Sequence, residues 1–374
     1  MAADKKTDKE IEERYAREDR EIAQERNDFL LPQIIDFVDK KQWMNLQPEY
    51  QRRQVWEKKR QSEFIESLLM NLPIPPVFLF EPEYSRYEVM DGQQRLSALC
   101  AFYANRLVLK GLEHWKELNG KTYADLPVKV QRGLDRRRIS AVVLQNATNS
   151  ANAEELRRIV FERLNTGGQK LNAQELRNCV YSGRFSNLLV ELAGFNIFND
   201  LIGVPRYDDH FRSGQVSAQL SQNPLFKRMI DCEIVLRFFS LRNESQIKGA
   251  MKSILDRCME NNQHIDEKQA VVMAADFKSR VELAYKIFGK EAFRVDFDPE
   301  GKVSQPYYDA VIIACDRTYD FRAALVRNKA TLKKNLLAVF SDDENYELLV
   351  GRGNTAKAIQ SRLKLVESIF RGVL

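Results

Sequence analysis

The sequence predicts an α+β fold, in which a small mixed sheet is followed by a mainly helical C-terminal region. Short apolar segments typical of strands occur at residues 77–80, 87–90 and 139–144. Residues 60–72 instead place their apolar side chains at helical spacing. Helical spacing also dominates beyond residue 150, so we expect the strands to belong to the first half of the chain.

Composition and charge divide the 374-residue chain into three expected parts, at residues 1–29, 30–150 and 151–374. The first part is charged, because its first 28 residues hold ten acidic and seven basic side chains with almost no apolar face. Such a segment is typical of a solvated helix, with a docking arm for a partner subunit as the alternative. The second part is the expected core domain and the third the expected helical region. The net charge of +5 is too small to imply a nucleic-acid partner.

Local patterns in the core domain predict its helices and strands. Helices are expected at residues 34–38 and 60–72, and the second ends at Pro73 because proline cannot continue a helix. The expected strands, in chain order, are at residues 77–80, 87–90, 106–110 and 139–144. The first two strands are close enough in sequence to pair as a hairpin.

Glycines and polar caps divide the region beyond residue 150 into helices. The turn at Thr166-Gly167-Gly168 ends a helix whose apolar side carries Arg163, which needs a partner because an unpaired buried charge is costly. Asn172, or a residue beside it, is expected to cap the next helix. Residues 226–240 are so rich in apolar side chains that we expect a helix buried on most sides. The last helix is expected at residues 355–372.

The most informative segment is YEVMDGQQRLSAL at residues 87–99, where a strand pattern passes directly into a helix pattern. The first N–H groups of a helix are unpaired and lie at the positive end of its dipole, so such a junction suits an anion. Gly92 permits a ligand to approach the backbone closely. Gln93 and Gln94 offer amide donors, and Arg95 offers a planar fork for phosphate. An ordinary tight turn with a solvated arginine is the alternative.

Two carboxylates near this junction each have more than one interpretation. Asp91 would repel phosphates unless a cation intervenes, so it either holds magnesium or caps the helix that begins at Gln93. Glu66 lies on the second helix of the core domain, beside core-facing residues. It either orients Arg95 or Arg52 through a charge-assisted pair or is solvated.

Several separated motifs carry a family resemblance. In chain order they are YQR-x-x-V-W from Tyr50, IESLL-x-x-x-PIPP from Ile65, DGQQRL from Asp91, F-x-R-L-N from Phe161 and L-x-x-x-ELR from Leu171. Over about residues 30–240 this series resembles the N-terminal domain of the GmrSD type IV restriction endonucleases, a bacterial family. The resemblance implies a core domain similar to the ParB/sulfiredoxin fold.

The resemblance also implies a nucleotide site at the DGQQR motif, with a nucleoside triphosphate and magnesium as cofactors. Asp91 and Arg95 are then the candidate catalytic residues, and Asp91 is the candidate metal ligand. The candidate nucleotide-binding residues are Gly92, Gln93, Gln94, Arg95, Gln51, Arg52, Arg163 and Asn165. Without the resemblance, Arg52 is interpreted as an ordinary surface charge.

Other nucleotide, metal and nuclease signatures are missing from the sequence. Gly120-Lys121-Thr122 resembles the end of a P-loop, but Trp115 stands where that motif requires glycine. The chain has no CxxC pair and no HExxH, and its three histidines lie in no nuclease signature. Many members of the resembled family carry a further, HNH-type nuclease domain, which residues 240–374 do not resemble. Either a nuclease partner acts in trans, or the role of the family has been repurposed in this chain.

Two basic clusters, at residues 58–60 and 132–138, are candidate contacts for DNA, with solvated faces as the alternative. The sequence has no apolar signal core, no run of 18 apolar residues and five scattered cysteines, which predicts a cytoplasmic protein with reduced thiols and no membrane segment.

Two functional hypotheses follow. The first is a nucleotide-binding regulatory component of a bacterial antiphage or restriction system, which hydrolyses a nucleoside triphosphate with magnesium and gates an assembly. The alternative is a non-catalytic ParB-like module, in which bound DNA or nucleotide only shifts the conformation.

Overall fold

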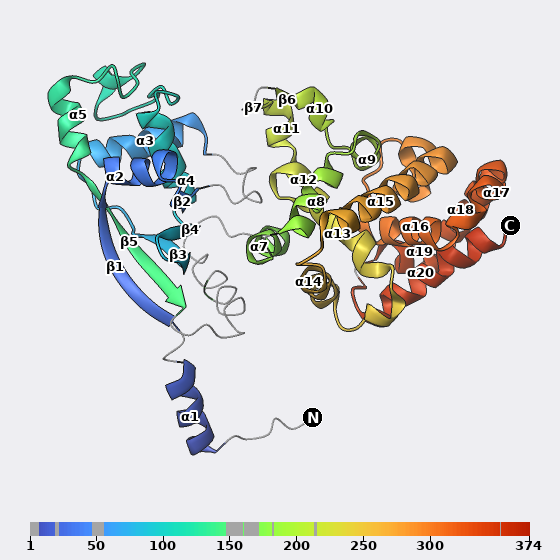
Figure 1. The fold of residues 1–374 in the computed structure, drawn as a ribbon. Coiled ribbons are helices and arrows are strands. Elements are labelled where there is room, and N and C mark those ends of the chain that lie inside the picture. The colour runs from blue at the N-terminus through green and yellow to red at the C-terminus, as the bar shows by residue number, and fades with distance from the viewer. Residues whose placement is uncertain are drawn as a thin grey trace. The chain divides into compact units, whose positions relative to one another are not determined.

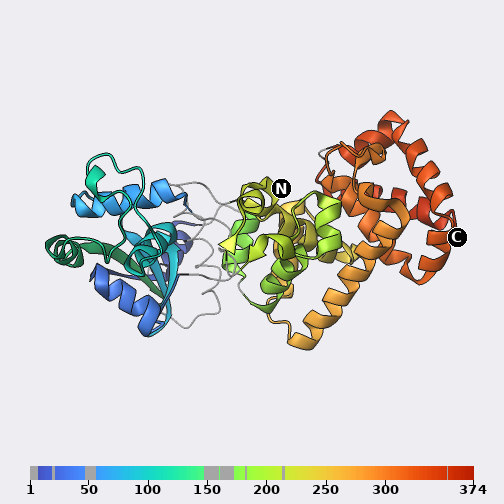
Figure 2. The same cartoon turned by 90° about the horizontal axis from the view of Figure 1, so that it is seen from above.

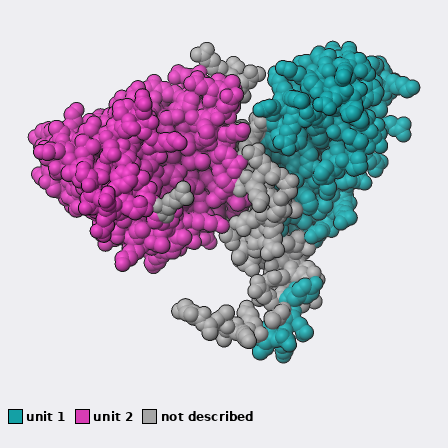
Figure 3. Space-filling model, turned by 180° about the vertical axis from the view of Figure 1, so that it is seen from behind, with its two compact units in different colours: residues 1–48, 54–170 teal, residues 49–53, 171–374 magenta. Residues whose placement is uncertain are grey.

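The chain folds into two compact units, which Figure 3 colours separately. Unit 1 comprises residues 1–48 and 54–170, and unit 2 comprises residues 49–53 and 171–374. The computed structural model describes residues 7–18, 22–46, 56–146, 160, 172–181, 183–212, 215–351 and 353–374. The expected domain boundary after residue 150 therefore lies outside the described residues.

Unit 1 contains a small mixed sheet (Figure 1). Its strands are β1 (Ile22–Leu30), β2 (Met44–Asn45), β3 (Val77–Glu83), β4 (Arg86–Asp91) and β5 (Arg138–Asn146). They lie in the order β1-β5-β3-β4-β2. The β1/β5 and β3/β4 pairs are antiparallel, whereas the β3/β5 and β2/β4 pairs are parallel. The predicted α+β class and the β3/β4 hairpin are thus confirmed.

Helices cover one face of this sheet and enclose the core of unit 1. They are α2 (Leu31–Ile35) with the π-helical turn Asp36–Lys40, α3 (Lys58–Leu69), α4 (Gln93–Tyr103), the 3-10 turn Lys116–Leu118 and α5 (Val128–Asp135). The separate helix α1 (Asp8–Glu18) precedes β1 in the chain. Helix α4 packs against α2 and α3 (Figures 1 and 2). Ile139, Ala141 and Val143 of β5 alternate with more exposed neighbours, so one face of the strand belongs to the core.

Two expectations for unit 1 are wrong. Residues 22–30 form strand β1 instead of continuing the charged N-terminal helix, and they pair with β5 along their whole length. Their charged side chains suit an edge strand, which meets solvent. Residues 106–110 form no strand, because their backbone groups form hydrogen bonds with residues that are not part of the sheet. Leu109 exchanges hydrogen bonds with Gly120 and Lys121, and the Lys110 N–H donates to the Ser62 hydroxyl.

Unit 2 is mainly helical (Figure 1), as predicted. Its helices are α7 (Ala173–Val180), α8 (Arg184–Ala193), α9 (Asn196–Ile202), α10 (Tyr207–His210), α11 (Ala218–Gln222), α12 (Pro224–Lys227), α13 (Ile230–Leu241), α14 (Met251–Asn261), α15 (Glu267–Phe288), α16 (Gln305–Arg317), α17 (Arg322–Arg327), α18 (Lys329–Phe340), α19 (Asp343–Val350) and α20 (Ala356–Arg371). The 3-10 turns are Glu244–Gln246, Gly289–Glu291, Val295–Phe297 and Tyr319–Phe321, and the short strands β6 (Phe211–Arg212) and β7 (Gln215–Val216) pair with each other.

Three expected features of the helical region fall on described residues. Two are present as predicted, whereas residues 226–240 form two helices instead of one, because α12 ends at Lys227 and α13 begins at Ile230. Asn172 caps α7 in a capping box with Glu175. Ten of the twelve residues of α13 are buried, so this helix runs through the core of unit 2. Helix α20 follows the N-cap Thr355 at the predicted place. The helix expected around Arg163 lies outside the described residues.

No helix among the described residues has both the length and the apolar composition needed to cross a membrane. Cys100, Cys232 and Cys315 are free and buried, and Cys258 is free and partly buried.

Candidate functional site

The DGQQR motif forms the junction between β4 and α4. Asp91 is the last residue of β4, Gly92 is the N-cap of α4, and Gln93 is the first helical residue. Gly92 has φ = 96°, in the left-handed region that favours glycine, and it supplies no side-chain cap. The capping interpretation of Asp91 is therefore wrong, because Gly92 occupies the cap position.

The polar side chains that follow Gly92 bind the backbone of three neighbouring segments. The Gln93 amide donates to the carbonyl of Leu46 over 2.7 Å. The side-chain oxygen of Gln94 accepts a hydrogen bond from the Trp56 N–H over 2.9 Å. Leu46 and Trp56 are the described residues that flank residues 47–55, so the two glutamines hold both flanks beside the start of α4.

Arg95 binds the third segment, which is the loop that leads into β3. Its guanidinium donates to the carbonyls of Pro75 and Pro76, and it forms an ion pair with Asp91 over 3.0 Å. The Arg95 side chain is 12% exposed and the Asp91 side chain 43% exposed. Burial lowers the pKa of Arg95, while Asp91 opposes that shift. Arg95 thus connects the junction to the loop before β3, and the Asp91 carboxylate is the more exposed partner of the ion pair.

Glu66 has neither of the environments expected for it. Its side chain is buried on α3, where its carboxylate accepts the N–H groups of His114 and Trp115 over 2.8 Å each and that of Glu113 over 3.4 Å. Burial raises the pKa of Glu66, but the hydrogen bonds from the N–H groups of Trp115 and His114 lower it. The pKa of Glu66 is therefore below its ordinary value. Glu66 therefore holds the 113–115 loop instead of orienting an arginine.

We expect Glu66→Gln to lower the free energy of unfolding by about 2 kcal/mol at neutral pH, because an amide cannot replace a carboxylate that accepts three N–H groups. The pKa of Glu66 is lower in the folded state, so its contribution is present above the unfolded pKa and is lost as pH falls through the folded pKa. The gap between wild type and variant in urea unfolding should therefore close in acid. Glu63→Gln, one turn earlier and exposed, is the control, and an equal effect there would contradict the assignment.

The structure leaves four candidate nucleotide-binding residues and the candidate magnesium site untested. Gln51, Arg52, Arg163 and Asn165 lie outside the described residues, so their assignment stays a prediction. For magnesium, no group of three or more His, Cys, Asp or Glu side chains is placed to hold a metal ion within the described ranges. Asp91 alone would supply one oxygen, which fits magnesium only if phosphates and water complete the coordination.

The basic clusters differ in how available their side chains are. Lys58, Lys59 and Arg60 are exposed in the first turn of α3, where positive charge opposes the helix dipole. In the second cluster, Arg137 donates to the carbonyl of Leu69, whereas Arg136 is exposed. Within the first cluster, Lys59 pairs with Glu63 over 3.7 Å and Arg60 lies over the Trp56 ring, 4.8 Å from its centroid.

The sequence did not indicate which backbone groups form hydrogen bonds with the side chains of the motif. Leu46, Pro75 and Pro76 contribute carbonyls, and Trp56 an N–H, which any residue type would supply. The one available signal was the presence of the PIPP and V-W motifs in the same chain as DGQQR, since Pro75, Pro76 and Trp56 bind side chains of that motif.

Comparison with known proteins finds one family whose model matches the part of the chain that contains the DGQQR motif. The model of the GmrSD restriction endonuclease N-terminal domain family matches residues 33–182, which is less than half of the chain and includes the β4–α4 junction. Neither the curated proteins nor the solved structures contain a match. Residues 33–182 of this chain are therefore similar to the N-terminal domain of the GmrSD restriction endonucleases.

Proposed function

We propose that this chain is a nucleotide-binding regulatory component of a bacterial restriction or antiphage system. The β4–α4 junction would receive the phosphates of a nucleoside triphosphate. The observation that carries this proposal is the geometry of DGQQR, which places the N-terminus of an 11-residue helix without a side-chain cap directly after β4, inside the matched segment.

The described residues suit distinct roles in such a site. The amides of the first turn of α4 would bind phosphate oxygens, and the partly exposed Asp91 would hold magnesium together with those oxygens. Arg95 would position the junction through Pro75 and Pro76, and a bound phosphate would compete with Asp91 for its guanidinium. Hydrolysis would then arise from positioning and charge neutralisation, and a cytoplasmic partner would supply the nuclease.

Asp91→Asn tests this role with little disturbance of the fold, because Asp91 is partly exposed and asparagine has the same shape. We expect magnesium-dependent binding of ATP or GTP, measured by calorimetry, to weaken at least tenfold, which corresponds to about 1.4 kcal/mol. Phosphate release by the purified chain should fall at least as much. Asp39→Asn, at an exposed position of the same unit, should leave both unchanged.

The results separate the two functional hypotheses. If the wild-type chain binds no nucleoside triphosphate with magnesium, the proposed site is wrong. Binding without phosphate release would select the non-catalytic ParB-like module. The exposed cations in the first turn of α3 favour a DNA-binding form of that module, and Lys58→Glu should then abolish DNA retention at low salt.

A further inference from the structure

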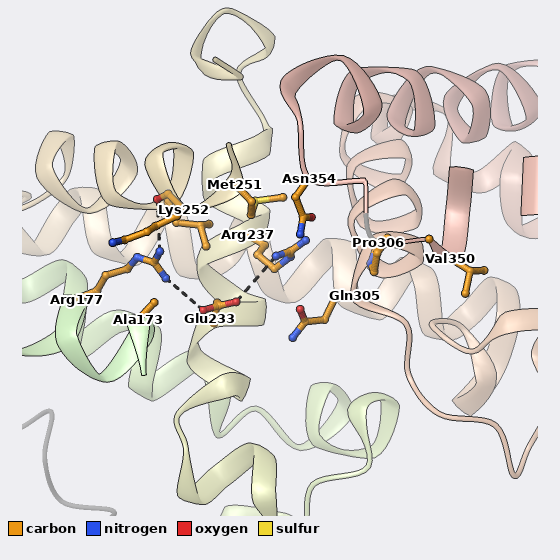
Figure 4. Close-up of a pocket in the computed structure, with 12 residues that line it drawn as sticks. Ala173, Arg177, Glu233, Arg237, Met251, Lys252, Gln305, Pro306, Val350 and Asn354 are labelled. Carbon is orange, nitrogen blue, oxygen red and sulfur yellow. Dashed lines mark hydrogen bonds and ion pairs between the residues drawn. The ribbon is translucent and has the colours of Figure 1, made fainter. Parts of the chain in front are cut away.

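A pocket in unit 2 lies outside the site described above (Figure 4). Its volume is about 370 Å³, a size that suits a small molecule. Its lining residues come from α7, α13, α14, α16, the end of α19 and the loop before α20: they are Ala173, Arg177, Glu233, Arg237, Met251, Lys252, Leu255, Gln305, Pro306, Val350, Gly351 and Asn354.

Cations dominate the charged side chains of this lining. Arg177 and Arg237 are almost fully buried, at 3% and 4% exposed, and Lys252 is exposed at the edge. Glu233 is the one acidic residue among the lining side chains. It lies between the arginines, 3.2 Å from Nη1 of Arg177 and 4.0 Å from Nη1 of Arg237 (Figure 4).

Each of the two arginines also binds a carboxylate that is not part of the pocket lining. Arg177 donates through Nε to Asp256 over 2.7 Å, and Arg237 binds Asp309 through Nε and Nη2. Nη1 of Arg237 makes no hydrogen bond with any described residue, since its contact with Glu233 is too long for one. The buried guanidinium of Arg237 therefore lines the pocket, and the N–H groups on its Nη1 atom are available to donate hydrogen bonds to a ligand.

Helix termini add to the positive potential. The first-turn residues Ala173 of α7, Lys252 of α14 and Gln305 of α16 all line the pocket, so three helix N-termini meet there. Helix α14 has no side-chain cap. A single C-terminus, that of α19 at Val350, opposes them. Three helix N-termini, together with the Nη1 group of Arg237 that makes no hydrogen bond with a described residue, favour an anion in this pocket.

We propose that this pocket binds a small organic anion that carries a phosphoryl group. The phosphoryl oxygens would accept hydrogen bonds from Nη1 of Arg237 and from Lys252, while Met251 and Leu255 would contact the carbon skeleton. In the absence of a ligand, Glu233 forms ion pairs with both arginines. A bound anion would compete with Glu233 for the two guanidinium groups. Because the pocket belongs to unit 2, the proposal does not depend on the nucleotide site at DGQQR.

Two variants with opposite expected effects test the pocket. Lys252→Glu reverses an exposed charge and should weaken the binding of AMP and inorganic phosphate about tenfold. Glu233→Gln removes the competing charge but keeps an oxygen for Arg177, and it should tighten both about tenfold. Lys334→Glu, a reversal at an exposed site away from the pocket, should change neither.

Calorimetry without magnesium measures both ligands, and circular dichroism checks that each variant is folded. Opposite shifts in Lys252→Glu and Glu233→Gln support the pocket, and tighter binding of AMP than of phosphate supports an organic ligand. Absence of binding in wild type and in Glu233→Gln would overturn the proposal. Binding that neither variant changes would also overturn it, because the ligand would then bind elsewhere on the chain.

Discussion

Replacing Asp309 by asparagine is expected to lower the free energy of unfolding of unit 2 by about 3–5 kcal/mol. Asp309 lies on α16 and is fully buried. Its carboxylate accepts two hydrogen bonds from Arg237, one of them over 2.7 Å from Nε, and it lies 3.5 Å from Nη2 of the fully buried Arg362. Asparagine would leave two buried guanidinium groups without the carboxylate that they share.

The pKa values of the two arginines show how unequally they depend on Asp309. Burial opposes the charged form of Arg237, but Asp309 raises the pKa of Arg237 above its ordinary value. Burial lowers the pKa of Arg362, and the attraction of Asp309 does not fully offset it. Nε of Arg362 also has no hydrogen-bond partner among the described residues. Loss of the Asp309 charge therefore acts on two cations, one of which is already incompletely satisfied.

Urea unfolding monitored by far-UV circular dichroism measures this effect. Asp320→Asn, at an exposed position in the same unit, is the matched control and should shift stability by less than about 0.5 kcal/mol. Equal midpoints for the two variants would show that Asp309 is not the counter-charge of the arginines. Any Asp309→Asn protein that remains folded should also bind phosphate more weakly, because Arg237 would lose the partner that orients it in the pocket.

Gly92→Ala is expected to cost about 3 kcal/mol of stability and to disrupt the β4–α4 junction. The left-handed φ of 96° costs a non-glycine residue roughly 1–2 kcal/mol. In addition, a Cβ atom at this position would lie 2.5 Å from Cγ1 of Val77 and 3.1 Å from Nη2 of Arg95. Val77 is a buried residue of β3, so it cannot move away without disturbing the core, and the overlap adds about 1–3 kcal/mol.

Gly120→Ala separates the two contributions. Gly120 also lies in unit 1 and has a positive φ of 83°, but a Cβ atom there would meet no atom within 4 Å. The control should therefore show the backbone cost alone, and Gly92→Ala should be destabilised further by the overlap with Val77. If urea unfolding gives the same loss for both variants, the close packing assigned to Gly92 is wrong.

Local patterns predicted the elements whose signals are contained in a few adjacent residues. The β3/β4 hairpin, helix α3 and the Asn172 cap are cases in which periodicity or a single side chain is sufficient. Strand β1 was missed because its sequence, IAQERNDFL, is largely polar. Its partner β5 begins more than a hundred residues later, and this long-range pairing, not local propensity, makes it a strand.

In the candidate site, too, local patterns predicted some features, whereas contacts between distant residues decided others. Residue types and spacing placed Asp91, Gly92, Gln93, Gln94 and Arg95 at a strand–helix junction, which the structure contains. The partner of Glu66 was mispredicted, because a buried carboxylate binds whichever donors the fold brings to it, and here those are backbone N–H groups 47 to 49 residues away. Sequence spacing carries no information about such backbone donors.

The amino-acid sequence established the α+β class, the helical second half and the similarity of residues 33–182 to the GmrSD N-terminal domain, since periodicity and short motifs record these properties residue by residue. Long-range packing settled the rest: the loops that Arg95 and the two glutamines hold, and the anion pocket assembled from residues between 173 and 354. The physical reason is that hydrogen bonds and buried charges depend on distances in space. Those distances are set only when helices and strands far apart in the chain have packed together.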